Sequence, residues 1–209
     1  MKPVYDVDGI TIYHADCADV LPGIDPSTVG LLLTDPPYGI DLNTDYARAG
    51  GVTYPQIVGD SEPFNPSALL TFGRVVLFGA NRYTEWLPNG EWIIWRKRGA
   101  AYFMAAAELA WHNCDGHRGR VDYFETTYAA ARSEDGHLHP AQKPVALMRW
   151  ILEKWTEPGD LILDPYMGSG PVARACADLG RRYIGIEIVE EYVEAAINRL
   201  GQTAFDLNQ

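Results

Sequence analysis

Residues 31–40 read LLLTDPPYGI, an apolar run that ends at an acid, two prolines and a tyrosine. Pro36 and Pro37 fix φ and remove two backbone donors, which leaves rigid carbonyl acceptors beside the Asp35 carboxylate. Rigid acceptors suit an N–H donor such as the exocyclic amino group of a nucleobase, and Tyr38 is placed to stack on that base. The stretch therefore predicts an amino-group site. The alternative is a proline turn that only ends a core strand.

Three further apolar runs also end at an acid, namely Asp16, Asp164 and Glu187. In an open α/β sheet, ligands bind beyond the carboxyl ends of the strands, so these acids are candidates for chemistry. An acid after a strand can equally be a turn former or a helix cap, and for Asp16 the two interpretations stay open.

A glycine-bearing turn joins two of these runs in the sequence LILDPYMGSGPVARACADLGRRYIGIEI. Gly168 and Gly170 let the backbone approach a ligand closely, and an acid about twenty residues further on, here Glu187, is placed to bind ribose hydroxyls. The turn lacks the third glycine of the dinucleotide pattern. It therefore predicts a site for a nucleoside-bearing cofactor.

Seven apolar runs are typical of strands. They are residues 9–16, 29–35, 74–80, 91–97, 106–111, 159–164 and 182–188. Helical periodicity follows Pro144 and recurs over residues 189–200, where Gly201 supplies the stop. Alternating strands and helices predict an α/β layered fold with one large sheet.

Length and composition indicate one compact domain, since the chain has 209 residues of which 47% are hydrophobic. No run reaches the roughly 18 to 20 apolar residues of a membrane helix, so we expect a cytoplasmic protein without a membrane partner. Residues 41–63 and 112–142 show no sustained period and are interpreted as long functional loops. The net charge of −11 opposes nucleic-acid binding, which normally recruits a surplus of Lys and Arg.

The motifs TDPPYG, HPAQKP and LDPYMGSG, in this order, resemble those of the β-class amino-group DNA methyltransferases. The resemblance spans residues 10–200 and implies a Rossmann-like S-adenosylmethionine-dependent methyltransferase fold. That fold has a mostly parallel seven-stranded sheet with helices on both faces, and the order of its motifs is permuted. The implied activity is site-specific methylation of a base amino group in duplex DNA, as in restriction-modification, with the base flipped out. Adenine N6 is favoured over cytosine N4, and a second copy of the chain is a candidate partner.

The resemblance also assigns roles to individual residues. The catalytic residues are Asp35, Pro36, Pro37 and Tyr38, and no metal is needed. The cofactor residues are Asp16, Lys143, Asp164, Tyr166, Gly168, Ser169, Gly170 and Glu187, with Lys143 near the methionine end and Asp16 near the adenine. A single domain over residues 1–209 would carry target recognition in loops 41–63 and 112–138.

Two basic clusters with nearby aromatic residues predict a DNA-facing rim despite the acidic whole. They consist of Arg96, Lys97 and Arg98, and of Arg118 and Arg120. A solvated surface loop is the alternative for both clusters.

Two other functions stay open. The acidic charge would also suit an RNA-methylating enzyme with the same amino-group site. His112, Cys114 and His117, with His137 and His139 nearby, could instead hold zinc in an interaction module built on an inactive methyltransferase core.

Overall fold

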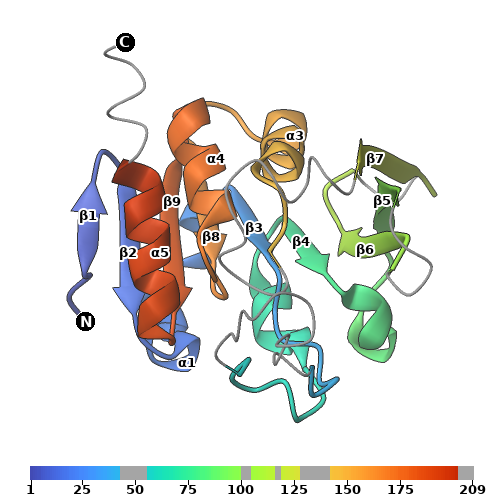
Figure 1. The fold of residues 1–209 in the computed structure, drawn as a ribbon, viewed down its shortest axis with the longest axis horizontal. Coiled ribbons are helices and arrows are strands. Elements are labelled where there is room, and N and C mark those ends of the chain that lie inside the picture. Colours follow the sequence, from blue (N-terminus) through green and yellow to red (C-terminus); the bar gives the residue numbers. More distant parts are fainter. Residues whose placement is uncertain (43–55, 100–104, 116–118, 128–141, 202–209) are drawn as a thin grey trace.

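The computed structural model describes residues 1–42, 56–99, 105–115, 119–127 and 142–201. In these ranges nine strands form one sheet, in the order β1-β2-β9-β8-β3-β4-β6-β5-β7 (Figure 1). The strands are β1 Tyr5–Val7, β2 Ile10–His14, β3 Leu31–Thr34, β4 Val75–Phe78, β5 Glu91–Arg98, β6 Ala107–His112, β7 Val121–Thr127, β8 Leu161–Asp164 and β9 Arg182–Glu187. The central strands from β2 to β4 are parallel to one another, whereas β1 and β6 run antiparallel to their neighbours.

All seven predicted strands are present, but the predicted count of seven strands is too low. The additional strands, β1 and β7, lie at the two edges of the sheet. The prediction that 112–142 is a loop is wrong over Val121–Thr127, because these residues pair in parallel with β5 along their whole length. Residues 128–141 lie outside the described residues.

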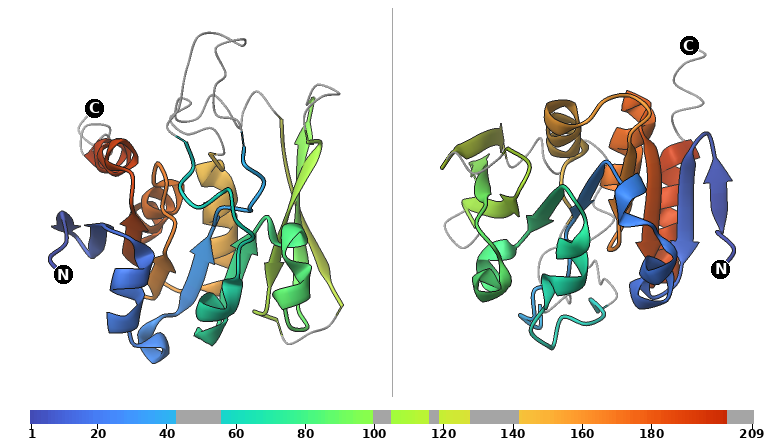
Figure 2. Two further views of the ribbon diagram at one scale, coloured as in Figure 1. Left: turned by 90° about the horizontal axis from the view of Figure 1, so that it is seen from below. Right: turned by 180° about the vertical axis from the view of Figure 1, so that it is seen from behind.

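Helices cover the two faces of the sheet unequally. The helices α3 Val145–Trp155, α4 Pro171–Leu179 and α5 Glu190–Gly201 share one face, where α4 contacts both of the others. The view from behind shows α5 on the far side of β2 and β9 (Figure 2). The other face carries the one-turn helix α1 Cys17–Val20 and short 3₁₀ turns. The 3₁₀ turns are Leu21–Gly23, Pro26–Thr28, Pro66–Thr71, Ala80–Arg82 and Thr84–Trp86.

Strand β3 shows how the sequence produces two cores. All four of its residues are buried, as expected for a parallel strand covered on both faces. Because side chains alternate, Leu31 and Leu33 join the core beneath α3, α4 and α5, whereas Leu32 joins the core beneath the 3₁₀ turns. A buried apolar side chain contributes roughly 1.5 to 3 kcal/mol, so both layers hold β3 in place.

The strand order reverses between β3 and β8. From β8 the chain crosses through α4 to β9 on one side, and from β3 it continues to β4 on the other. Such a switch point opens a crevice at the carboxyl ends of the two strands, where doubly wound sheets bind their ligands. Asp35 follows β3 and Asp164 ends β8, so both predicted acids are at this crevice. In the described ranges no helix is both long and apolar enough to cross a membrane.

Candidate active site

A cavity of about 470 Å³ opens at the switch point. Its volume lies in the range of roughly 300 to 1,000 Å³ that is typical of small-molecule sites. Among the residues that line it are the predicted catalytic residues Asp35, Pro36, Pro37 and Tyr38, and the predicted cofactor residues Asp16, Lys143, Asp164, Tyr166, Gly168, Ser169 and Glu187. The fold therefore brings two groups of residues that are distant in sequence to one cavity.

The carboxylate of Asp35 is held by two side chains. Its Oδ1 accepts a hydrogen bond from the Tyr38 hydroxyl, and its Oδ2 accepts one from the Lys143 ammonium. Burial raises the pKa of Asp35, while the positive charge of Lys143 opposes that rise. An ionised carboxylate has about four lone-pair positions, so these two contacts leave acceptor capacity for a further donor.

The ring of Tyr38 packs against Gly79, the residue after β4. A β-carbon at position 79 would lie 1.9 Å from ring atom Cε1 of Tyr38, and Gly79 has a φ of +64°. Both observations require glycine there. The structure thus fixes the orientation of Tyr38, and the predicted stacking of this ring on a base stays a prediction.

Lys143 lies against Asp35, the acid that the sequence predicts to be catalytic. Its side chain is 3% exposed, and its Nζ is also 3.1 Å from Oε2 of Glu108 on β6. Burial alone would lower the pKa of Lys143, but Asp35 and Glu108 outweigh it and hold that pKa well above its ordinary value. Lys143 is therefore a buried cation. Its predicted place near the methionine end of the cofactor rests on the family resemblance alone.

Asp60, which sequence reasoning missed, holds the chain that follows the two prolines. It is 4% exposed, and its Oδ1 accepts from the backbone N–H groups of Tyr38 at 2.8 Å and Gly39 at 3.0 Å. Its Oδ2 accepts from the N–H of Leu42 at 2.8 Å. No sequence pattern connects residue 60 to residue 38, because the intervening chain forms neither strand nor helix in its described part.

Asp60→Ala should leave these backbone donors without an acceptor. We expect the unfolding free energy to fall by about 2 to 4 kcal/mol, because backbone donors lose their acceptor. The methyl transfer that the motif resemblance implies should slow by about tenfold or more, because the Asp35 loop loses its geometry. Asp60→Asn keeps one acceptor and should lie in between. Denaturant unfolding and single-turnover rates measure the two effects, with the exposed Asp19→Ala as control. A variant with the parental rate would show that Asp60 does not position the loop.

Asp164 lies at the bottom of the crevice and is 1% exposed. It accepts hydrogen bonds from the hydroxyls of Thr34 at 2.7 Å and Tyr183 at 3.2 Å, which join β3, β8 and β9. Burial raises the pKa of Asp164 to about 7, from an ordinary value of 3.8. Its contacts to protein groups support a structural contribution beside the predicted role in cofactor binding.

This raised pKa predicts a pH-dependent stability. Between pH 3.8 and about 7 the folded state binds the Asp164 proton more tightly than the unfolded state. The contribution of this residue to the unfolding free energy should therefore decrease as the pH rises through that window. Asp164→Asn has no proton to lose, so its stability relative to the parent should increase from pH 5 to pH 8. Equal pH slopes for variant and parent in denaturant unfolding would contradict this.

The turn after β8 meets the end of β9 through a carboxylate. The N–H of Gly168 donates to Glu187 Oε2 at 2.8 Å, and Oε1 accepts from the N–H groups of Ile188 and Val189 at 3.0 and 2.9 Å. Burial raises the pKa of Glu187. Gly168 has a φ of +54°, a conformation that favours glycine. The predicted pairing of a glycine turn with an acid is thus present in three dimensions.

Asp16 and Gly170 have local roles that the sequence also allowed. Asp16 caps α1 by accepting from the N–H of Ala18 at 2.8 Å, and it lines the cavity as well. Gly170 precedes α4 and is not among the residues that line the cavity, and its predicted contact with the cofactor stays a prediction. A β-carbon there would lie 2.7 Å from Cβ of Ala196, so glycine allows α4 to pack on α5.

Comparisons with known proteins agree with this geometry. The model of the N6/N4 methylase family, described as DNA methylase, matches residues 94–198, which is half of the chain. The chain belongs to this family. The Type II methyltransferase M2.DpnII of Streptococcus pneumoniae is 27% identical over 248 residues, which cover 95% of this chain and 92% of that protein.

Solved structures confirm the expected methyltransferase fold for this family member. A crystal structure of an M1.HpyAVI–SAM complex has a TM-score of 0.62 and 26% identity, and the match covers 91% of this chain and 98% of that one. The PvuII DNA methyltransferase, named as cytosine-N4-specific, has a TM-score of 0.64. It is 16% identical, with 95% of this chain and 88% of that chain covered, so its likeness bears on the fold alone.

The predicted basic rim of the methylase is only partly on the surface. Arg96 and Arg98 are exposed on one side of β5, and each forms an ion pair with Glu125 on β7. Lys97 points to the opposite side, as strand alternation requires, and its ammonium bonds Glu108 there. Lys97 therefore lies on the other side of β5 from Arg96 and Arg98, and its predicted contact with DNA stays a prediction. Arg120 is exposed, and Arg118 lies outside the described residues.

The zinc alternative rested on His112, Cys114 and three further histidines. Burial raises the pKa of the Cys114 thiol to about 12. His117, His137 and His139 lie outside the described residues. The described part of the chain therefore does not test the zinc alternative.

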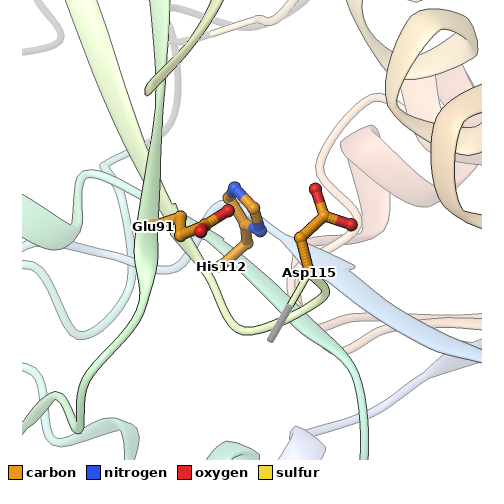
Figure 3. A group of neighbouring side chains, drawn as sticks. All are labelled: Glu91, His112 and Asp115. Carbon is orange, nitrogen blue, oxygen red and sulfur yellow. The ribbon is translucent and has the colours of Figure 1, made fainter. Parts of the chain in front are cut away.

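A different group gathers around His112. Figure 3 shows its ring with the carboxyl groups of Glu91 and Asp115 on either side, and one polar atom of each residue lies within 4.8 Å of the others. Burial lowers the pKa of His112, so the ring is neutral. Its Nδ1 accepts from the N–H of Cys114 at 3.4 Å, which places the ring proton on Nε2.

That proton faces a carboxylate that already has a cation. His112 Nε2 is 3.7 Å from Asp122 Oδ2, and the other oxygen of Asp122 bonds the Lys154 ammonium. The Trp155 ring lies 4.5 Å from the His112 ring and donates from its Nε1 to Asp115 at 2.8 Å. These contacts describe a structural network between β6, β7 and α3.

Proposed function

We propose that the chain transfers a methyl group from S-adenosylmethionine to the exocyclic amino group of a base in duplex DNA, with adenine N6 as the favoured target. Membership of the DNA methylase family supports DNA amino-group methylation. The observation that carries the proposal is the position of Asp35, directly before two prolines and in one cavity with Gly168 and Glu187. The preference for adenine rests on the resemblance of the motif that begins with Asp35.

The acceptor end of the cavity suits a flipped amino group. Asp35 and the carbonyl of Pro36 would accept its two hydrogens, which localises the nitrogen lone pair and points it at the methyl donor. Asp35 must be ionised for this task, and Lys143 favours the ionised form through its charge. Unstacking the base costs a few kcal/mol, and stacking on Tyr38 would offset part of that cost.

The other end of the cavity fits a nucleoside-bearing cofactor. Glu187 accepts three backbone N–H groups and keeps lone-pair capacity for ribose hydroxyls. Gly168 offers close backbone approach through its positive φ, and the apolar side chains of Ile186 and Val189 also line the cavity. When bound, S-adenosylmethionine supplies an electrophilic methyl group on a sulfonium centre. These residues hold and orient it.

Arg96, Arg98, Arg118 and Arg120 are the proposed phosphate contacts, with loops 41–63 and 112–138 as target-recognition inserts in a single domain. Arg96 and Arg98 lie at the carboxyl end of β5, whereas Arg120 lies beside Glu91 at its start, so these contacts would span the length of the strand. Part of the range 112–138 is strand β7 rather than loop. Its exposed Tyr123 supports a role of this range in target recognition. Homodimer formation belongs to the same proposal.

Nucleoside mass spectrometry tests this function. The protein is incubated with methyl-labelled S-adenosylmethionine and unmethylated DNA, and the digested nucleosides are identified. Labelled N6-methyladenine is the expected product. N4-methylcytosine would keep the amino-group mechanism and correct the base. Label found only in an added RNA, or in no nucleic acid, would reject DNA as the substrate.

A further inference from the structure

A row of four alternating charges leads from strand β5 to the catalytic acid. Lys97 on β5 bonds Glu108 on β6, Glu108 contacts Lys143 at 3.1 Å, and Lys143 bonds Asp35. The side chains of Lys97, Glu108, Lys143 and Asp35 are 14%, 28%, 3% and 21% exposed, so little solvent screens their charges. Two cations and two anions together leave the row without net charge.

We propose that Glu108 is a positioning residue for methyl transfer, which holds the Lys143 ammonium against Asp35 and, with Lys97, balances the charge around the amino-group acceptor. The proposal rests on the proposed function, because it concerns the same acceptor. It adds a residue outside the three sequence motifs, on a strand that is antiparallel to its neighbours.

The two carboxylate oxygens of Glu108 contact two different lysines. Its Oε2 meets Lys143 on the cavity side, and its Oε1 meets Lys97 on the far side. Burial alone would raise the pKa of Glu108, but the two lysines outweigh it and hold that pKa below its ordinary value. Glu108 is therefore an anion, and a bound amino group that competes for Asp35 would leave Lys143 still anchored on Glu108.

The charge of Glu108 also acts on the catalytic acid itself. Two charged groups act on Asp35: Lys143 lowers the pKa of its carboxyl, and Glu108 raises it. The Tyr38 hydroxyl donates a hydrogen bond to the same carboxylate. Tyr83 and Asp164 lie close enough to interact with Asp35 as well. Burial and Glu108 thus make Asp35 a more basic acceptor than a solvated aspartate, whereas Lys143 keeps it ionised.

Removing the charge of Glu108 should therefore move the titration of Asp35 in a defined direction. Glu108→Gln keeps an oxygen acceptor but leaves the row with a net positive charge, so Asp35 should titrate about one pH unit lower. Lys97→Met leaves a net negative charge and should move the titration to higher pH. A purely structural role for Glu108 would change the melting temperature and leave the titration where it was.

The experiment follows the carboxyl carbon of Asp35 by NMR. Protein labelled with ¹³C at aspartate carboxyl groups is titrated without cofactor or DNA, and Asp35→Asn identifies the signal. The expected result is a downward shift in Glu108→Gln, a return toward the parental value in Glu108→Asp, and no shift in the exposed control Glu194→Gln. If Glu108→Gln does not fold, the upward shift in Lys97→Met carries the test. Parental titration in the folded variants would overturn the proposal.

A second readout links this charge to catalysis. The rate of single-turnover DNA methylation is measured against pH with saturating cofactor. In Glu108→Gln the maximal rate should be about tenfold lower, because a less basic Asp35 accepts the amino group less strongly. The fall of the rate on the acidic side should move to lower pH. The affinity for S-adenosylmethionine should stay within about twofold. A parent protein that methylates no nucleic acid would reject the proposed function, and the NMR titration would still decide the charge coupling.

Discussion

Replacing Asp35 by alanine should slow methyl transfer by about 100-fold or more while the affinity for S-adenosylmethionine changes little. The substitution removes an acceptor from the target amino group. It removes no contact from Gly168 or Glu187, which lie at the other end of the cavity. Lys143 keeps its contact with Glu108, so the buried ammonium retains an anion. The loss should therefore appear in the rate and not in the fold.

Single-turnover methylation with saturating cofactor measures this effect. Asp35→Asn preserves the shape but turns an amide N–H₂ group toward the amino group, so it should be nearly as slow as alanine. Tyr38→Ala should lose stacking worth about 1 to 3 kcal/mol, and a duplex with a mismatched target base should rescue it more than Asp35→Ala. Equal rescue of both variants would mean that Tyr38 does not support the flipped base.

Gly168→Val should abolish cofactor binding. The φ of +54° disfavours a β-branched residue, and Gly168 lines the cavity while its N–H donates to Glu187. Gly180→Val is the matched control. Gly180 also has a positive φ, +67°, but a β-carbon there meets nothing within 4 Å, and it ends α4 away from the cavity.

Isothermal titration calorimetry separates strain from ligand exclusion. Both glycine variants should lose stability, because each forces a side chain into the left-handed region. Only Gly168→Val should lose heat of binding with S-adenosylmethionine, whereas Gly180→Val should bind with about the parental affinity. Unchanged binding by a folded Gly168→Val would remove this turn from the cofactor site.

The strands that the sequence did not reveal share a physical property. Strands β1 and β7 lie at the sheet edges, and their residues are exposed or half-buried. An edge strand needs no apolar run, because one long side is solvated. The central strands are buried on both faces and therefore read as continuous apolar runs such as LLLT in β3.

The acids at the strand ends of the candidate site were predictable because their strands are parallel. Parallel strands place their carboxyl ends at one edge of the sheet, so Asp35 and Glu187 had to lie at the same edge once the strands were recognised. The sequence did not predict Asp60 or Glu108, because Asp60 lies in a loop and Glu108 lies on the antiparallel strand β6. Strand alternation in β5 would have separated Lys97 from Arg96, since neighbouring residues of a strand point to opposite faces.

The central claim is that one cavity holds the methyl donor and the target amino group with separate residues. It is tested most directly by measuring cofactor affinity and methyl transfer to DNA on one preparation of Asp35→Ala beside the parent. The account predicts S-adenosylmethionine affinity within about twofold of the parent and transfer reduced by about 100-fold or more. Parental transfer by Asp35→Ala, or a parallel loss of affinity and rate, would contradict it.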